Sequence, residues 1–246
     1  MTDGPPTGGE GLTDDAFLGG RLRLWQPRPG FRSGTDAVLL AAACPARAGQ
    51  SVLDLGCGAG AVALCLGLRV PGLALAGLEI QPAYAALARR NAARAGLPLE
   101  VHEGSATAPP PALRRGFDHV VTNPPYVPPG TPPADGGRAT AMQVRLPLAD
   151  WVRAAGRRLV PGGRLTMILA TARLPEALAG LGPLGSAAVL PLAARPDAAP
   201  GRVILSARKG GRAGFRILPP LVLHEGAGHS PAATAILRDG APIDGL

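Results

Sequence analysis

Short apolar runs alternate along this chain with longer segments in which apolar residues recur at helical spacing. The apolar runs fall at residues 52–55, 73–78, 117–122 and 165–170, and the helical segments at 61–69, 82–95, 148–160 and 174–181. Two more apolar runs, residues 187–192 and 203–207, come later in the chain. Regular alternation of strand and helix is typical of a parallel sheet, because a parallel connection needs a long crossover.

We therefore expect an α/β fold, a three-layer sandwich of helices on a seven-stranded, mostly parallel sheet. The last two apolar runs should pair antiparallel at one edge of that sheet. In open sheets of this kind, ligands bind beyond the carboxyl ends of the strands. The residues that follow each predicted strand are accordingly the candidates for chemistry.

A glycine turn follows the first of these strands. The sequence from residue 52 reads Val-Leu-Asp-Leu-Gly-Cys-Gly-Ala-Gly, and a helical segment comes next. Glycines at such a place let the backbone approach a ligand closely at a helix N-terminus. The spacing Gly-x-Gly-x-Gly departs from the dinucleotide fingerprint Gly-x-Gly-x-x-Gly. Candidate binding residues here are Asp54, Gly56, Cys57, Gly58 and Gly60.

Two more predicted strands end in polar groups. The second strand ends in Glu79, and an acid there can accept hydrogen bonds from ribose hydroxyls. The strand over 117–122 leads into the tetrapeptide Asn123-Pro124-Pro-Tyr126. Its prolines make a stiff, extended turn that could present an amide oxygen, a carbonyl and an aromatic ring to a planar nitrogen donor. A plain proline turn has the same sequence, so the inference depends on all three motifs occurring in this order.

With these motifs in this order, the chain resembles the class I S-adenosylmethionine-dependent methyltransferases, a Rossmann-like fold, and among them the enzymes that modify amide or exocyclic nitrogens. The resemblance covers roughly residues 20–235. It implies that the glycine turn holds the cofactor, that Glu79 holds its ribose, and that Asn123 contributes to both cofactor and target sites. It further implies that Pro124 binds the target amino group and that Tyr126 stacks on the target ring.

Residues 26–40 are similar to the corresponding segment of bacterial tRNA1(Val) adenine-N6 methyltransferases. That family has an aromatic-Arg-x-x-x-Asp-Ala-x-Leu-Leu pattern there, which begins in this chain at Phe31 and Arg32. Both residues are therefore expected to contact the substrate. One position departs from related enzymes: Ser105 follows the third strand where an Asp often meets the cofactor's adenine. The resemblance places Ser105 in the cofactor site as a neutral hydrogen-bonding group.

Composition is that of a globular protein rather than a disordered one. Of 246 residues, 46% are hydrophobic and 17% charged. Residues 1–20 are rich in glycine and acids and have no basic residue, which predicts a mobile acidic tail before a single domain over 21–246. That tail lacks the basic start and apolar stretch of a secretion signal, and no apolar run reaches membrane-spanning length. We expect a cytoplasmic protein with no membrane partner.

The cysteines and histidines do not indicate a metal site. The three cysteines, Cys44, Cys57 and Cys65, have no partners at ligand spacing, and an odd count fits a reducing compartment. Only two of the four histidines are near each other in sequence, and no cysteine lies beside them. His119 lies inside an apolar strand and is expected to be a packed residue.

Net charge points to a polyanionic partner. The chain carries +8, although abundant Ala, Gly, Pro and Arg indicate a general compositional bias. Basic residues gather over 202–216 without an acid, around a Lys-Gly-Gly-Arg sequence that predicts a hairpin between strands at 203–207 and 215–218. Arg208, Lys209 and Arg212 are candidates for phosphate contacts, and a solvated basic turn is the alternative. A Pro/Gly-rich stretch over 127–147 is either a lid on the substrate or a long insertion.

These observations favour methyl transfer from S-adenosylmethionine to N6 of an adenine in tRNA. Three alternatives remain: N5-methylation of a release-factor glutamine, guanine-N2 methylation of rRNA, and a non-catalytic RNA-binding scaffold. Release-factor enzymes of similar motif carry a helical domain before the glycine turn, whereas about 50 residues precede it here. The basic charge also suits RNA better than protein.

Overall fold

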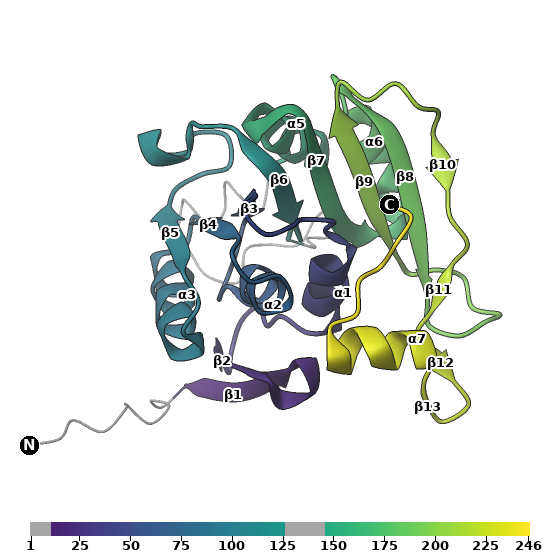
Figure 1. Ribbon diagram of the computed structural model, residues 1–246, viewed down its shortest axis with the longest axis horizontal. Helices are drawn as coiled ribbons and strands as arrows, with labels where there is room; N and C mark the ends of the chain where they lie inside the picture. The colour runs from purple at the N-terminus through teal and green to yellow at the C-terminus, as the bar shows by residue number, and fades with distance from the viewer. Residues whose placement is uncertain (1–10, 126–145) are drawn as a thin grey trace, which may run out of the picture.

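The computed structural model describes residues 11–125 and 146–246, and in these ranges helices and strands alternate after an N-terminal hairpin (Figure 1). The strands are β1 (Leu12–Phe17), β2 (Leu22–Pro27), β3 (Ser51–Leu55), β4 (Ala74–Glu79), β5 (Leu99–Glu103), β6 (Phe117–Thr122), β7 (Leu159–Ala170), β8 (Leu184–Ala193), β9 (Arg202–Lys209), β10 (Arg216–Ile217), β11 (Leu221–Val222), β12 (His224–Glu225) and β13 (Gly228–His229). The helices are α1 (Thr35–Ala43), α2 (Ala61–Arg69), α3 (Pro82–Ala95), α5 (Leu148–Arg158), α6 (Leu174–Ala179) and α7 (Pro231–Thr234), with short helical turns at Leu18–Gly20, Pro111–Leu113, Thr171–Arg173 and Ala235–Asp239.

The central sheet confirms the expected fold class. Its order over the described residues is β10-β8-β9-β7-β6-β3-β4-β5, with β11 also paired to β8. Strands β3 to β7 pair in parallel with one another, and β9 is antiparallel to both β7 and β8. The seven long strands are those the sequence predicts, and the two-residue strands β10 and β11 extend the edge.

Alternating side chains fill two cores, one on each face of the sheet. Val52 and Val121 face a core that includes α1 and α2, whereas Leu53 and Val120 face a core that includes α5 and α6. Both faces of the central strands are therefore buried, which explains why these strands are almost continuously apolar. Helix α3 begins at a proline and ends before Gly96, whose φ of 63° suits glycine.

The predicted hairpin around Lys209 is wrong. Strand β10 pairs in parallel with β8, not with β9, so β8 lies between the two runs that the turn was expected to join. Figure 1 shows this crossover to the outer edge of β8. The reason is that β9 already pairs with β7 on one side and β8 on the other, which leaves β9 no free edge for a hairpin partner.

The predicted mobile tail is wrong for residues 11–20, since Leu12–Phe17 forms strand β1 and pairs in full register with β2. Its acids are held by arginines from elsewhere: Asp14 pairs with Arg23 and Arg94, and Asp15 pairs with Arg32. The hairpin β1–β2 packs beside α2 and α3 at one side of the sheet (Figure 1).

Three predicted features lie outside the described residues: residues 1–10 of the tail, Tyr126, and most of the stretch 127–147 that was considered as a lid, including Arg138 and Arg145. Within the described ranges no helix is long and apolar enough to cross a membrane.

Candidate active site

The glycine turn after β3 folds back onto β4. The amides of Gly56 and Cys57 both donate to the Leu78 carbonyl, at 2.8 and 3.0 Å, and Gly60 N–H closes the turn on the Cys57 carbonyl at 2.8 Å. Gly56, Gly58 and Gly60 have φ angles of 78°, 54° and 88°, which side chains other than glycine rarely adopt. The turn thus brings bare backbone to the carboxyl edge of the sheet, directly before α2.

Two buried carboxyl groups flank this turn. Glu79 accepts from Gly58 N–H and from Gln81 N–H, each at 2.9 Å. Asp54 accepts from Ala63 N–H in the first turn of α2 at 3.1 Å through Oδ2, while Oδ1 is buried with no partner among the described residues. Each carboxylate therefore ties one end of the glycine turn and keeps acceptor capacity for a ligand.

Burial is the main influence on both acids. It raises the pKa of Asp54 to about 7, with the Ala63 amide acting against it and the charge of Glu79 adding to it. Burial also raises the pKa of Glu79, and the amides of Gln81 and Gly58 oppose that rise. Both carboxylates are poorly solvated and lie next to the same turn. A positively charged ligand bound there would stabilise their ionised forms.

The turn that begins at Asn123, after β6, lies beside the glycine turn. Strands β3 and β6 are parallel with Asp54 opposite Val121, so Gly56 and Asn123 each follow the end of neighbouring strands, about 5 Å apart by the usual strand spacing. Thr122 fixes this alignment by donating to the Leu55 carbonyl at 2.7 Å. The Oδ1 atom of Asn123 is buried and has no hydrogen-bond partner in the described ranges.

Trp151 in α5 lies under both turns. Its indole N–H donates to Thr122 Oγ1 at 2.7 Å, and a Cβ placed on Gly56 would lie 3.0 Å from its ring. Trp151 is 2% exposed, so its ring is fixed in place and leaves no room for a side chain at position 56. Sequence reasoning did not single out Trp151, because a tryptophan in an apolar helix has the same pattern as ordinary core.

Asn91 is a second residue that sequence reasoning missed. Its Nδ2 donates to the Ala59 carbonyl in the glycine turn at 2.9 Å and to the Trp25 carbonyl at 3.0 Å, and its Oδ1 accepts from Trp25 N–H at 2.8 Å. The side chain is fully buried. A lone polar residue on the buried face of the predicted helix 82–95 was the available signal.

The loop between β2 and α1, residues 28–34, carries the predicted substrate residues Phe31 and Arg32. Phe31 is 49% exposed, and its carbonyl accepts from the Tyr84 hydroxyl at 3.0 Å. Arg32 is turned toward Asp15, with Nη2 at 2.8 Å from Oδ1. The structure therefore brings this loop to the start of α3, close to Glu79.

The remaining predicted cofactor residues lie at the same edge. Ser105 follows β5, and its Oγ lies 3.1 Å from Thr107 Oγ1, so the hydroxyl already takes part in a local turn. Cys57 is buried against β4, where a Cβ on Gly77 would come within 2.8 Å of its sulfur. Its contribution to the turn is its backbone amide rather than its thiol.

Arg208, Lys209 and Arg212 lie away from these turns. In the pairing of β7 with β9, Arg208 is opposite Arg164, which is six residues before the end of β7. Lys209 donates to the Leu159 carbonyl, at the beginning of β7. These residues are therefore at the amino end of the parallel strands, opposite the glycine turn.

Metal ligation has no support in the part of the chain that the structure describes, where no three His, Cys, Asp or Glu side chains gather. His119 packs as expected: it is 6% exposed, its Nε2 lies 3.1 Å from Gln50 Oε1, and burial lowers its pKa to about 4.

Comparison with known proteins gives this arrangement a family. Residues 32–181 match the family described as methyltransferase small domain. A tRNA1(Val) (adenine(37)-N6)-methyltransferase of Dickeya chrysanthemi is 31% identical over 194 residues, which are 75% of each chain. A release factor glutamine methyltransferase of Deinococcus radiodurans is 34% identical over 178 residues, 65% of this chain and 58% of the relative.

Among solved structures, one described as a predicted O-methyltransferase from Agrobacterium tumefaciens aligns with a TM-score of 0.70 and 28% identity. The alignment covers 85% of this chain and 98% of that one. It supports the class I methyltransferase fold over most of this chain and nearly the whole of the other.

The site described above fits S-adenosylmethionine. Asp54 and Glu79 are carboxylates with remaining acceptor capacity next to a turn of bare backbone, as a ligand with a ribose diol and positive charge requires. The chain belongs to the methyltransferase small domain family and is a class I, S-adenosylmethionine-dependent methyltransferase.

Proposed function

We propose that this enzyme methylates N6 of an adenine in tRNA. The observation that carries the proposal is the Oδ1 atom of Asn123, which is buried and has no hydrogen-bond partner among the residues that the structure describes, one residue beyond β6 and beside the glycine turn. A buried acceptor without a donor costs free energy, about 1–3 kcal/mol, and such groups persist where a ligand supplies the partner. An amino group on a planar ring is a donor of the right kind.

The residues of this chain act by positioning. S-adenosylmethionine supplies a methyl group already activated on a sulfonium centre. The lone pair of an exocyclic nitrogen is delocalised into its ring, and Asn123 Oδ1 with the Pro124 carbonyl would accept the two N–H groups. With the two N–H groups held in this way, the nitrogen lone pair points at the methyl group along the line of attack. That orientation is the main contribution of these residues to catalysis. Solvent takes up the released proton.

A target base must leave its stack to reach this turn, at a cost of a few kcal/mol. We assign Phe31 and Tyr126 to stacking on the extruded base, which is worth about 1–3 kcal/mol per base. Phe31 has the exposure that this role requires, since half of its surface is open to solvent.

RNA is favoured over a protein glutamine for two reasons. The Dickeya relative, named for tRNA methylation, aligns over three quarters of both chains, whereas the Deinococcus relative, named for release-factor glutamine, aligns over a smaller share of its own length. The net charge of +8 also suits a polyanion. Glutamine methylation remains the second candidate, because an amide nitrogen would fit the same acceptors.

We further propose that basic side chains at the amino end of the sheet contact RNA phosphates. Three of them, Arg158, Arg208 and Lys209, donate to backbone carbonyls at Leu113, Gly162 and Leu159. None of the three forms an ion pair in the described part of the chain. Their charge is thus fixed in place but not neutralised by a carboxylate, which suits phosphate contact.

The decisive experiment offers purified enzyme and radiolabelled S-adenosylmethionine to total tRNA, to ribosomal RNA and to a release factor in parallel. We expect label in tRNA, recovered as N6-methyladenosine by nucleoside mass spectrometry. Label in the release factor would replace the proposal with the glutamine reaction. N2-methylguanosine in ribosomal RNA would replace it with the guanine reaction.

A further inference from the structure

A buried glutamine in strand β2 holds the loop 28–34 by hydrogen bonds to the backbone of Ser33. Gln26 is 1% exposed. Its Oε1 accepts from Ser33 N–H at 2.7 Å, and its Nε2 donates to the Ser33 carbonyl at 2.9 Å. The side-chain amide thus pairs with Ser33 as a neighbouring strand would, which fixes the backbone of the loop at that residue.

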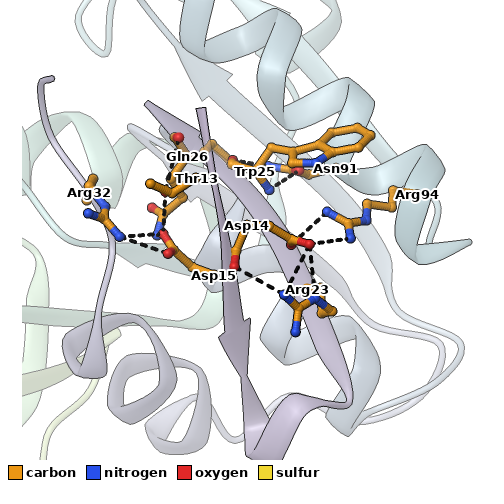
Figure 2. A network of polar contacts seen from close by, with 10 residues as sticks. Thr13, Asp14, Asp15, Arg23, Trp25, Gln26, Arg32, Asn91 and Arg94 are labelled. Atoms are coloured by element: carbon orange, nitrogen blue, oxygen red, sulfur yellow. Dashed lines mark hydrogen bonds and ion pairs between the residues drawn. The ribbon is translucent and has the colours of Figure 1, made fainter. Parts of the chain in front are cut away.

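Asp15 in β1 extends this attachment to Arg32, the loop residue adjacent to Ser33. Its Oδ2 accepts from Gln26 Nε2 at 2.7 Å, and both carboxylate oxygens lie within 2.9 Å of Arg32 Nη2 (Figure 2). Partial burial raises the pKa of Asp15, but the hydrogen bonds from Arg32, Gln26 and Thr13 outweigh it and lower the pKa below its ordinary value. The carboxylate is therefore ionised at neutral pH and joins the hairpin to consecutive residues of the loop.

The opposite side of the same loop contacts the cofactor site through Tyr84. The Tyr84 hydroxyl donates to the Phe31 carbonyl at 3.0 Å, and a Cβ on Gly30 would lie 2.8 Å from that hydroxyl oxygen. Tyr84 is in the first turn of α3, three residues after Gln81, whose N–H donates to Glu79 at 2.9 Å, so Tyr84 lies on the Glu79 side of the site. Burial raises the pKa of Tyr84, the hydrogen bond to the Phe31 carbonyl opposes that rise, and the negative charge of Glu79 adds to it. The loop therefore lies between the hairpin and the Glu79 side of the cofactor site.

We propose that Asp15 and Gln26 are positioning residues for S-adenosylmethionine binding. They hold the loop 28–34 against Tyr84, so that the wall of the site next to Glu79 is formed before the cofactor arrives. A wall ordered in advance removes the entropy cost of ordering a seven-residue loop during binding, and affinity rises accordingly. Removing the contacts of Asp15 or Gln26 with the loop should then weaken cofactor binding, although neither residue touches the cofactor.

The adjacent acid supplies a matched control. Asp14 lies on the same strand and forms ion pairs with Arg23 and Arg94, and among the described residues its side chain has no hydrogen bond or ion pair with the loop (Figure 2). Its bidentate bonds to Arg94, at 2.9 and 3.0 Å, join β1 to α3. Asp14→Asn and Asp15→Asn therefore remove the same charge from the same strand, and only Asp15→Asn loosens the loop.

The experiment measures S-adenosylmethionine affinity by calorimetry on the full chain without RNA, with a thermal melt for each variant. In Asp15→Asn an amide NH2 faces donors of Gln26 or Arg32, and we expect affinity to fall about threefold to tenfold. Asp14→Asn should stay within about twofold of wild type although its melting temperature falls similarly. Asp15→Glu, which restores a carboxylate, should recover part of the loss.

A double-mutant cycle with Arg32→Gln tests the connection itself. If the Asp15–Arg32 pair carries the effect, Asp15→Asn should cost less affinity in the Arg32→Gln background than in wild type. Unchanged affinity in Asp15→Asn, an equal loss in Asp14→Asn, or purely additive losses in the cycle would each overturn the proposal. Because no RNA is present, these outcomes are independent of which substrate the enzyme methylates.

Discussion

The two ends of the central sheet differ in which polar groups they present. At the carboxyl end, Asp54, Glu79 and Asn123 offer buried acceptors, two of them with an oxygen that has no partner in the described residues. At the amino end, Arg208 and Lys209 offer donors held by backbone carbonyls. The chemistry of the carboxyl end suits a donor-rich or cationic ligand, and the positive charge of the amino end suits an anion.

This difference teaches what each end can do. Strand β6 has six residues, so the two ends are about 20 Å apart at 3.3 Å per residue. A group at the amino end cannot touch a base bound at Asn123, and it can contribute only if the substrate is long enough to reach it. Groups at the carboxyl end should control chemistry and cofactor binding, and groups at the amino end should control only the hold on a polymer.

The largest effect should come from Asn123→Ala. This change removes an acceptor used at the target nitrogen, so methyl transfer should fall about a hundredfold or more. Cofactor affinity, measured separately by calorimetry, should fall far less than the rate of methyl transfer, because the ties of Glu79 to Gly58 and Gln81 remain. A variant that still transfers methyl groups at near wild-type rate would remove Asn123 from the chemistry.

Glu79→Gln should act on the cofactor instead. The charge-assisted hydrogen bonds of a carboxylate are worth about 1.5–3 kcal/mol, so S-adenosylmethionine affinity should fall at least about tenfold. Glu103→Gln is a matched control, since Glu103 is paired opposite Glu79 in β5, is exposed and bonds to Arg89. Equal losses in the two variants would mean that general charge at this edge, rather than Glu79, binds the cofactor.

Sequence predicted the carboxyl end better than the amino end, for a physical reason. The elements around Asp54 and Glu79 are consecutive strand–helix units, so local periodicity and right-handed crossovers nearly determine their arrangement. The residues of the turn at Lys209 are typical of a β-hairpin. The order of strands, however, depends on which sheet edges are already paired, and the local sequence does not contain that information. The acids of β1 likewise resemble a solvated tail until their arginine partners come from other elements.

Side chains that support the site were beyond sequence reasoning for a similar reason. Trp151 and Asn91 are distant in sequence from the turns they hold. Trp151 donates one hydrogen bond and the Asn91 side chain makes three, and hydrophobic periodicity predicts none of them. Gln26 lies within a segment that the sequence singled out by resemblance, yet its contact with Ser33 depends on the folded loop.

The raised pKa of Asp54, at the carboxyl end of the sheet, should make the free energy of unfolding depend on pH. Burial raises the pKa of Asp54 to about 7, whereas an unfolded Asp ionises near 3.9. The folded state therefore keeps a proton that the unfolded state has lost, and the stabilisation present below about pH 4 is lost as pH rises through about 7. Free-energy measurements by urea unfolding between pH 5 and pH 8 should show this fall for the ligand-free enzyme, and Asp54→Asn should flatten it.

Cofactor affinity should depend on pH in the opposite sense. Positive charge on the bound cofactor favours ionised Asp54, so binding releases a proton, and affinity should rise about tenfold between pH 6 and pH 8. The α-amino group of the cofactor titrates in every variant, so the informative quantity is the difference between wild type and Asp54→Asn. Parallel pH profiles for the two proteins would show that Asp54 stays protonated when the cofactor binds.

The smallest effect should come from the amino end. Replacing Arg208, Lys209 and Arg212 by Ala should weaken tRNA binding only several-fold at moderate salt. It should also make the slope of log affinity against log salt less negative by about one to two, because fewer counterions are released. Cofactor affinity should be unchanged, since these side chains lie at the other end of the strands.

A control with the same loss of charge separates contact from net charge. Arg23, Arg89 and Arg153 each pair with a carboxylate, at Asp14, Glu103 and Asp150, so their replacement by Ala also removes three positive charges. If the amino end touches phosphates, only the first triple variant should change the salt slope, because Arg208 and Lys209 are held by backbone carbonyls and form no ion pair in the described structure, whereas the control arginines are already paired. Equal slopes in the two triple variants would mean that RNA responds to net charge alone. The phosphate contacts would then have to come from the carboxyl end, where Arg28 and Arg32 belong to the loop beside the site.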